Sequence, residues 1–345
     1  MADGSSEHLG RTRATIRDVA ALAGVGIKTV SRVVNAEPNV SPQMRERVER
    51  AIKALNFKPN QGAGALRRGA GKTLTVGLLL DAVDNPFSAA VNRAVEEVAL
   101  NRYTAVFAAS FDDDPERERA LVDAFTRRRV DGLILTTISS DHGYLQIERE
   151  QGTPLVFVDR PPIGLLADAV VSNNFDSSVT ATRHLLERGH RRIAHLCDDM
   201  HIATAQERSR GYHAAMAAAG LSTDHLEVTD LFTEVDAQAA VQELLARDEA
   251  PTAIFASQNM VSVGVIRALH QLGAADRVAM VGFDDLLLAD LVRPAITVMA
   301  QNPSEIGRLA ATRLFARLDG DTAPAQTLVV PTTLIERGSG EIPPW

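Results

Sequence analysis

Cysteine is almost absent from this chain of 345 residues, which contains a single one, Cys197. One cysteine excludes a disulfide framework and a cysteine-based zinc site within one chain. Cys197 lies in the apolar run RIAHLC, so we expect it to be a core residue.

Long apolar segments are absent as well. The sequence has no uninterrupted apolar run of 18 residues, and its first fourteen residues are polar and charged. A membrane-spanning helix needs about 20 apolar residues, and a secretion signal needs an apolar central region. We therefore expect a soluble, cytoplasmic protein.

Catalytic and phosphate-binding motifs are also missing. Nine histidines include no His-Glu-x-x-His pair, and no Gly-x-Ser-x-Gly turn occurs. The run LRRGAGKT at 66–73 nearly matches a phosphate-binding loop, but Leu66 replaces its first glycine and the apolar strand follows the loop. His184, His190 and His195 fit helix-end or core positions. We expect no enzyme, cofactor or metal.

Charge is divided unevenly along the chain. Residues 1–72 hold 13 Lys/Arg and 6 Asp/Glu, a net charge of +7, and the whole chain carries −8, so the remainder carries −15. A basic segment can neutralise DNA phosphates, whereas an acidic body is repelled by them. The asymmetry favours a nucleic-acid-binding N-terminal region over an evenly solvated surface.

The basic region contains two short helical patterns joined by a glycine turn, in TIRDVAALAGVGIKTVSRVVN at 15–35. Thr15 and Asp18 form a capping box, and Gly24 ends the first helix, whose apolar side is marked by Ile16, Val19 and Leu22. In the second helix the inward stripe is Val30, Val33 and Val34, which leaves these side chains outward: Ile27, Lys28, Ser31, Arg32 and Asn35. This is the pattern of a DNA-reading helix-turn-helix.

A third helix follows, and its start is marked by Ser41 as the N-cap and Pro42 at the first helical position. Apolar residues then repeat at helical spacing until the helix ends before Pro59, at Val48, Ile52 and Leu55.

From residue 74 onward, short apolar runs alternate with helical patterns, which is typical of parallel α/β sheets covered by helices on both faces. The strands are expected to begin near residues 74, 104, 131, 154, 169, 192, 252 and 278. The helices are expected over 87–101, 115–128, 175–188, 205–219, 236–248, 260–272 and 303–318.

The segment TVSRVVN together with LNFKPNQGAGALRRG at 55–69 resembles the LacI/GalR family of bacterial transcriptional regulators, and the similarity extends over about residues 15–337. The resemblance implies an all-α helix-turn-helix headpiece and a two-lobed α/β body like type I periplasmic binding proteins, with chain crossings near 172, 301 and 331. The implied domains are a disordered tail (1–14), the DNA-binding domain (15–59), a hinge helix (60–72) and the effector-binding and dimerisation domain (73–340).

For DNA, the resemblance places Ile27, Lys28 and Arg32 in the major groove, where an arginine can bind guanine O6 and N7 together. Phosphate contacts are expected from Thr15, Thr29, Ser31, Asn35 and Lys58. The resemblance also makes Leu66 a minor-groove wedge, with Asn60 and Ala63 on the same short helix.

For the effector, the resemblance places a ligand in the cleft between the lobes, with Arg208 of QERSRGY and Asp284 of VGFDD as its main contacts. Other cleft positions implied are Asp81, Asn85, Phe87, Arg160, Asn173, Thr204, Phe232 and Ser257. The family commonly has Asn-Asp where this chain reads Ser257-Gln258-Asn259, so the pocket differs there. A sugar is the first expectation, and a purine, another polyol or a phosphorylated metabolite stays open.

These features together predict a ligand-responsive repressor that binds a pseudo-palindromic DNA operator as a homodimer. Pairing of dimers into tetramers stays open. Two alternatives are a solute-binding protein of a transporter, which needs an export signal, and an architectural DNA-binding protein without an effector.

Overall fold

The computed structural model describes residues 14–34, 37–58 and 72–345. Contacts divide the chain into two compact units, with the boundary between Thr73 and Leu74. None of the described helices is long and apolar enough to cross a membrane.

The described residues of the first unit form a bundle of three helices, α1 (Ile16–Ala23), α2 (Ile27–Val34) and α3 (Pro42–Ala54). Thr15 and Asp18 form the expected capping box, and Gly24 ends α1 in the left-handed conformation at φ 61°. Each helix contributes to a small core around Val19, Val30 and Val48. The expectation that Leu22 faces this core was wrong, since Leu22 is 57% exposed and two alanines of α1 pack inward instead.

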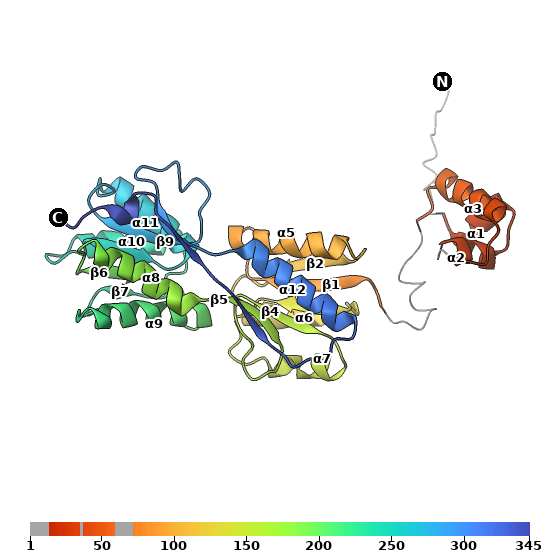
Figure 1. Cartoon of the computed structure of the whole chain (residues 1–345), viewed down its shortest axis with the longest axis horizontal. Helices are drawn as coiled ribbons and strands as arrows, with labels where there is room; N and C mark the ends of the chain where they lie inside the picture. The colour runs from red at the N-terminus through yellow and green to blue at the C-terminus, as the bar shows by residue number, and fades with distance from the viewer. Residues whose placement is uncertain (1–13, 35–36, 59–71) are drawn as a thin grey trace, which may run out of the picture. The chain divides into compact units, whose positions relative to one another are not determined.

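The first lobe of the second unit is a six-stranded, fully parallel sheet in the order β11-β5-β4-β3-β1-β2. Its strands are β1 (Thr75–Leu80), β2 (Ala105–Ser110), β3 (Gly132–Leu135), β4 (Leu155–Val158), β5 (Asp168–Ser172) and β11 (Thr327–Val330). Its helices are α5 (Pro86–Leu100), α6 (Pro115–Arg127), α7 (Gln146–Glu150) and α12 (Pro303–Leu318), with η1 (Gly143–Leu145) before α7. Helices α5 and α12 pack against each other beside this sheet (Figure 1).

The second lobe repeats this plan with the order β12-β10-β9-β8-β6-β7, and only the β10–β12 pair is antiparallel. Its strands are β6 (Ile193–Leu196), β7 (Glu227–Val228), β8 (Ala253–Ala256), β9 (Ala279–Phe283), β10 (Thr297–Ala300) and β12 (Thr333–Ile335). Its helices are α8 (Asn174–Glu187), α9 (Ala203–Ala218), α10 (Glu234–Leu245) and α11 (Asn259–Gln271), with η2 (Ser339–Glu341) near the C-terminus. Helix α8 packs on α9, and α10 packs on α11.

Eight strands and seven body helices form where the sequence predicts them, whereas β7, β10, β11, β12 and α7 were not predicted. These five elements span two to five residues each, but length alone does not explain why they were missed, since β3, β4, β6 and β8 have four residues each and were predicted. Strand β12 also breaks the expected parallel arrangement, because it pairs with β10 in the opposite direction.

The chain passes between the lobes three times: from β5 to α8, from β10 to α12, and from β11 to β12. Figure 1 shows these crossing segments running between the two sheets. They fall at the positions expected near 172, 301 and 331. Parallel strands in both lobes end beside these crossings, which makes the space between the lobes the natural place for a ligand.

Candidate functional site

The exposed face of α2 is the candidate DNA-reading surface. Ile27, Lys28 and Arg32 are exposed, while Val30 and Val33 are buried in the helical core. Arg32 Nε lies 3.7 Å from Glu37 Oε2, but both side chains are about half exposed. An exposed ion pair of this kind contributes at most about 1 kcal/mol to stability, so the Arg32 guanidinium can give up Glu37 and form hydrogen bonds with the edge of a base instead.

The residues expected to contact phosphates have different surroundings. Lys58 is exposed, and Thr29 and Ser31 are half-buried on α2. The hydroxyl of Thr15 donates to Asp18 Oδ2 at 2.7 Å, so this side chain already caps α1. Four further expected DNA contacts lie outside the described residues, namely Asn35, Asn60, Ala63 and Leu66.

A cavity of about 730 Å³, including space open to solvent, lies between the two lobes of the body. It sits at the carboxyl ends of β1, β4, β6 and β9, because the residues that follow these strands line it. Eight of the ten expected effector positions are in its wall: Asp81, Asn85, Phe87, Arg160, Thr204, Arg208, Phe232 and Asp284.

Arg208, on α9, is held rigidly in the wall of this cavity. Its Nε donates to Asn174 Oδ1 at 2.8 Å, and its Nη1 donates to the Ser257 carbonyl oxygen at 2.8 Å. The guanidinium also stacks on Phe283, with Cζ 3.9 Å from the ring centroid. Nη2 makes no hydrogen bond with the described part of the chain, so it is available to a ligand in the cavity.

Ser257 and Asn173 are not in the cavity wall, and the expectation that they line it was wrong. Ser257 is fully buried, and its hydroxyl bonds to His195 Nε2 at 2.8 Å, so only its carbonyl serves the site by holding Arg208. The side chain of Asn173 turns toward the β11–β12 crossing, where its Oδ1 accepts from the Thr332 backbone N–H at 2.8 Å. Both side chains are committed to structure.

His195 supports this arrangement through its hydrogen bond with Ser257. Its ring is fully buried, stacks between Tyr212 and Phe255, and contacts Glu227 Oε1 through Nδ1 at 3.0 Å. Burial lowers the pKa of His195, so the neutral ring is favoured. The expectation of a core histidine is confirmed, as is that of a buried Cys197.

Asp284 follows β9 with a left-handed backbone at φ 66°. Its Oδ1 accepts from Gln301 Nε2 at 2.8 Å, and Gln301 Oε1 in turn accepts from the Ser172 hydroxyl. Burial raises the pKa of Asp284 to about 6, although Arg208 and Gln301 oppose the shift. Because Ser172 and Gln301 lie on two crossing segments, the cavity acid is linked directly to the connections between the lobes.

The first lobe contributes a comparable group around Arg160. Arg160 Nη1 donates to the Thr137 carbonyl oxygen at 3.1 Å, and its Nη2 lies 3.9 Å from Asp81 Oδ2. Its Nε lies 3.8 Å from Asp159 Oδ2 and has no hydrogen-bond partner among the described residues. Burial raises the pKa of Asp81 to about 6, with Arg160 lowering it and Asp113 raising it further.

The two lobes touch at the cavity through a pair of amides. Asn259 Nδ2, on α11, donates to Asn85 Oδ1 at 2.8 Å, and Asn85 also caps α5. Of the three residues after β8 that differ from the pattern of the family that the sequence resembles, Asn259 therefore joins the two lobes. Gln258, the neighbour of Asn259, also lines the cavity.

Several lining residues were not predicted, notably Asp113, Asp159, Asp198, Asp199, Asn259 and Gln301. A signal for two of them was present in the sequence. Asp198 follows β6 in the second lobe much as Asp81 follows β1 in the first, and Asp159 directly precedes Arg160. Extending the rule that ligands sit at the carboxyl ends of parallel strands to every strand would have found both.

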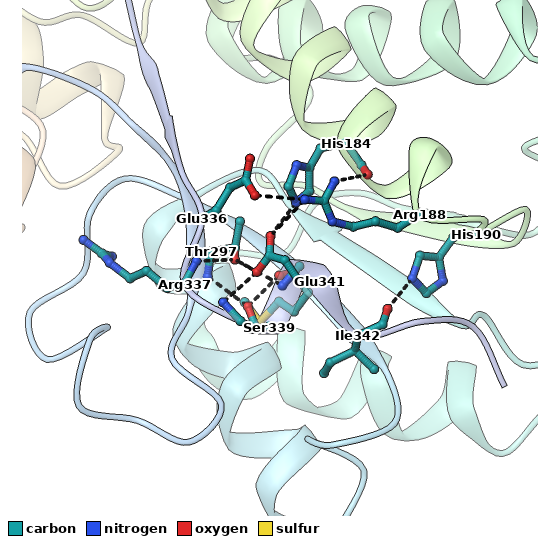
Figure 2. Close-up of polar contacts among 12 residues, drawn as sticks. His184, Arg188, His190, Thr297, Glu336, Arg337, Ser339, Glu341 and Ile342 are labelled. Atoms are coloured by element: carbon teal, nitrogen blue, oxygen red, sulfur yellow. Dashed lines mark hydrogen bonds and ion pairs between the residues drawn. The ribbon is translucent and has the colours of Figure 1, made fainter.

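One group of potential metal ligands occurs in the described part of the chain, formed by His184, Glu336 and Glu341. A protein cation already occupies it, since Arg188 Nη2 lies 2.9 Å from Glu336 Oε2 and 3.7 Å from Glu341 Oε1 (Figure 2). His184 Nε2 also bonds to Glu341 Oε1 at 2.7 Å. The group therefore fastens the C-terminal segment to α8 rather than offering an open metal site.

Comparison with known proteins gives two family matches. The family of bacterial regulatory proteins of lacI type matches residues 15–60, and a periplasmic binding protein-like domain matches residues 182–340. The ribose operon repressor of Escherichia coli (strain K12) is 34% identical over 330 residues, which cover 94% of this chain and 99% of that repressor.

Solved structures agree with this result. A complex of the transcriptional regulator CelR with cellobiose is 33% identical, with a TM-score of 0.70 and coverage of 95% of this chain and 100% of that one. The Lac repressor dimer bound to operator and an anti-inducer has a TM-score of 0.86 at 23% identity, covering 95% and 99% of the two chains, and shows the same fold.

Proposed function

The chain belongs to the lacI family of bacterial regulatory proteins, and from this premise we propose that it represses transcription under the control of a sugar bound between its lobes. The family consists of DNA-binding transcriptional regulators and not of enzymes. The observation that carries the proposal is the connection from Asp284 in the cavity, through Gln301, to Ser172 on another crossing segment.

Recognition of the operator is assigned to α2. Arg32 would bind guanine O6 and N7 in the major groove, with Ile27 against a thymine methyl and Lys28 beside it. Thr15, Thr29, Ser31, Asn35 and Lys58 would hold phosphates, while Leu66, Asn60 and Ala63 would enter the minor groove. The exposure of Ile27, Lys28 and Arg32 supports the assignment.

A sugar is supported by the chemistry of the cavity and by the relatives. Arg208 offers a fixed donor at Nη2, Asp284 offers acceptor oxygens, and Phe87 and Phe232 supply apolar surface for a sugar ring. The matched relatives are named for ribose and solved with cellobiose. Asn173 and Ser257 are not expected to contact the sugar, because their side chains are bonded outside the cavity wall.

The switch would work by changing the angle between the lobes. A ligand that bonds to Asp284 competes with Gln301, whose amide otherwise joins two crossing segments. A coupling of about 1 to 3 kcal/mol is typical of allosteric control and is within the range of one or two such hydrogen bonds.

We further propose that the repressor is a cytoplasmic homodimer on a pseudo-palindromic operator. The second lobe exposes a group of leucines after β9, with Leu287 at 86%, Leu288 at 55% and Leu291 at 62% exposure. Apolar side chains exposed together in this way mark protein–protein contacts. A symmetric pair would place two copies of α2 on two half-sites one helical turn apart.

The proposal is tested by selecting bound fragments from a random DNA pool with the full chain and then screening sugars for their effect on retention. We expect an inverted repeat to be enriched, with binding that weakens steeply as salt rises. No enrichment, or enrichment that no sugar alters, would contradict the operator or the effector part respectively.

A further inference from the structure

We infer that Asn85 and Asn259 form a latch that holds the two lobes together without help from a ligand. Asn259 Nδ2 donates to Asn85 Oδ1 at 2.8 Å, and Asn85 Nδ2 donates back to Asn259 Oδ1 at 3.4 Å. Asn259 is 4% exposed, so little water competes for these bonds. Outside the crossing segments, this is the one hydrogen-bonded side-chain pair between the lobes in the described residues.

Each amide of the latch is oriented by the start of its own helix. Asn85 is the N-cap of α5, where its Oδ1 also accepts from the Phe87 backbone N–H at 3.0 Å. Asn259 is the first residue of α11, and its Oδ1 also accepts from the Met260 backbone N–H at 2.8 Å. Because each oxygen is held by its own helix, each NH2 group is directed at the other lobe. The two helices therefore fix the geometry of the latch.

The latch lies far from the segments that connect the lobes. Those segments leave the first lobe from β5 and β11, whereas Asn85 follows β1, which is three strands from β5 in the sheet. In the second lobe β8, which precedes Asn259, lies two strands from β10. Neighbouring strands are about 4.8 Å apart, so the latch is roughly 10 to 15 Å from the connections. A contact at this distance must break when the lobes rotate apart about the crossing segments.

The neighbouring contact between the lobes is apolar. Ile138, which follows β3, packs against a small cluster of the second lobe that contains Cys197, Ile202 and Ala205. Apolar contacts are not directional, so they allow the lobes to slide or rotate, whereas paired amides accept only a narrow range of geometries. The amides therefore fix the relative position of the lobes on this side of the cavity.

The latch also bears on effector binding, and this part of the inference rests on the proposed function of the cavity. Asn85 and Asn259 both line the cavity, so the latch forms part of its wall. A protein whose binding-competent arrangement is already populated binds its ligand more tightly than one that must first close. The latch therefore stabilises the arrangement in which both lobes face the sugar.

Replacement by aspartate tests the latch and keeps both helix starts, because aspartate begins helices as well as asparagine does. Asn85→Asp leaves an oxygen that accepts from the Asn259 amide, and Asn259→Asp leaves one that accepts from the Asn85 amide. Each single variant therefore keeps one of the two hydrogen bonds. The double variant has two carboxylates and no donor, so the lobes repel each other at this point when the pH is kept at about 8.

The separation of the lobes is measured in the full chain by double electron–electron resonance, with spin labels on Val83→Cys and Val235→Cys in a Cys197→Ala background. Val83 lies two residues before Asn85, Val235 lies three residues after Phe232 of the cavity wall, and the two valines are 51% and 65% exposed. The labelled protein is diluted with excess unlabelled protein, so that the distances come from one copy.

We expect one narrow distance distribution in the parent and in both single variants. An opening of about 20° at about 15 Å from the connections separates the labels by about 5 Å, and the double variant should show at least this shift. A second double variant, Asn85→Ser with Asn259→Ser, removes the amides without adding charge, since serine also starts helices but is shorter. It should shift the distance in the same direction, and its shift supports the latch even where the aspartate pair prevents folding.

Asn302→Asp provides the matched control. Asn302 is likewise an N-cap followed by proline, but its Oδ1 accepts from the Glu305 backbone N–H of its own helix, α12. Combined with Asn259→Asp, it adds the same charge as the double variant and leaves one hydrogen bond of the latch. We expect the parent's distance distribution.

Three results would overturn the latch: a parent distribution that is already broad, parent distances in both double variants, or a shift of equal size in the Asn302→Asp control. The last would mean that added charge alone opens the lobes. No sugar is present in this measurement, whereas the proposed function is tested by the sugar screen. Failure of the effector proposal and failure of the latch are therefore seen in different experiments.

Discussion

Gly211 lies at a close contact between two helices, near Arg208 of the cavity. Its replacement by alanine should lower both the stability of the protein and its affinity for an effector. Gly211 lies on α9, one turn after Arg208, where α9 crosses α8. A Cβ at this position would collide with the Phe175 carbonyl oxygen of α8 and lie 2.8 Å from Ser178 Cβ. Since ordinary contacts begin at 3.4 Å, the two helices must separate by roughly 0.6 Å or more.

The separation of α8 and α9 also affects Arg208. Arg208 on α9 donates to Asn174 on α8 over 2.8 Å, and the added distance takes this hydrogen bond beyond its normal length of about 3.2 Å. Overpacking costs about 1 to 3 kcal/mol and loss of the charged hydrogen bond about 1.5 to 3 kcal/mol. Against this, alanine stabilises a helix by about 1 kcal/mol relative to glycine. We therefore expect Gly211→Ala to lower the free energy of unfolding by about 3 kcal/mol.

Gly264→Ala provides the matched control. Gly264, on α11, makes an equivalent close approach to α10, where a Cβ would collide with the Glu234 carbonyl oxygen and lie 2.7 Å from Ala237 Cβ. Helix α10 carries none of the described cavity-lining residues, so it can move without disturbing the cleft. We expect a loss of about 1 kcal/mol and a normal effector response.

Urea unfolding of the full chain gives the stability change, and the effector concentration that alters operator binding gives the functional one. For Gly211→Ala this concentration should rise about tenfold or more, because a misplaced Arg208 loses at least about 1.4 kcal/mol of ligand binding. A Gly211→Ala protein as stable as the parent, or one with an unchanged dose response, would refute the reasoning.

Three further outcomes are expected. Arg32→Ala should cost about 1 to 3 kcal/mol on the selected operator and relax preference at one base pair, whereas Lys58→Ala should weaken all DNA sequences alike; equal losses for Arg32→Ala on operator and random DNA would defeat its assignment. Asp284→Asn should stabilise the ligand-free protein by up to about 3 kcal/mol above pH 6, because the raised pKa of Asp284 means that its ionised carboxylate destabilises the folded state. The gain should vanish as the pH falls toward about 4, where the carboxyl is protonated. A gain in thermal unfolding that does not depend on pH would contradict this. Asp168→Asn should cost about 3 kcal/mol in urea unfolding, because this carboxylate is 3% exposed and pairs with two arginines of α12; a change below about 1 kcal/mol would show that the pair is not needed.

The amino-acid sequence by itself determined the local elements. The capping box at Thr15, the glycine after α1 and the Ser-Pro start of α3 act within a few residues, so the helical unit follows from short-range rules. The continuous apolar strands likewise predict buried parallel sheets, and the residues just after them predict most of the cleft.

Tertiary structure decided which of two adjacent polar side chains faces the cavity between the lobes. Ser257 and Gln258 are neighbours after β8, yet the serine turns inward to His195 and the glutamine lines the cavity, because the buried ring needs a hydrogen-bond partner. The same holds for Asn173, drawn away by the Thr332 backbone, and for Asn259, which bonds to Asn85 across 174 positions. Such choices depend on partners distant in the chain, and local periodicity carries no information about them.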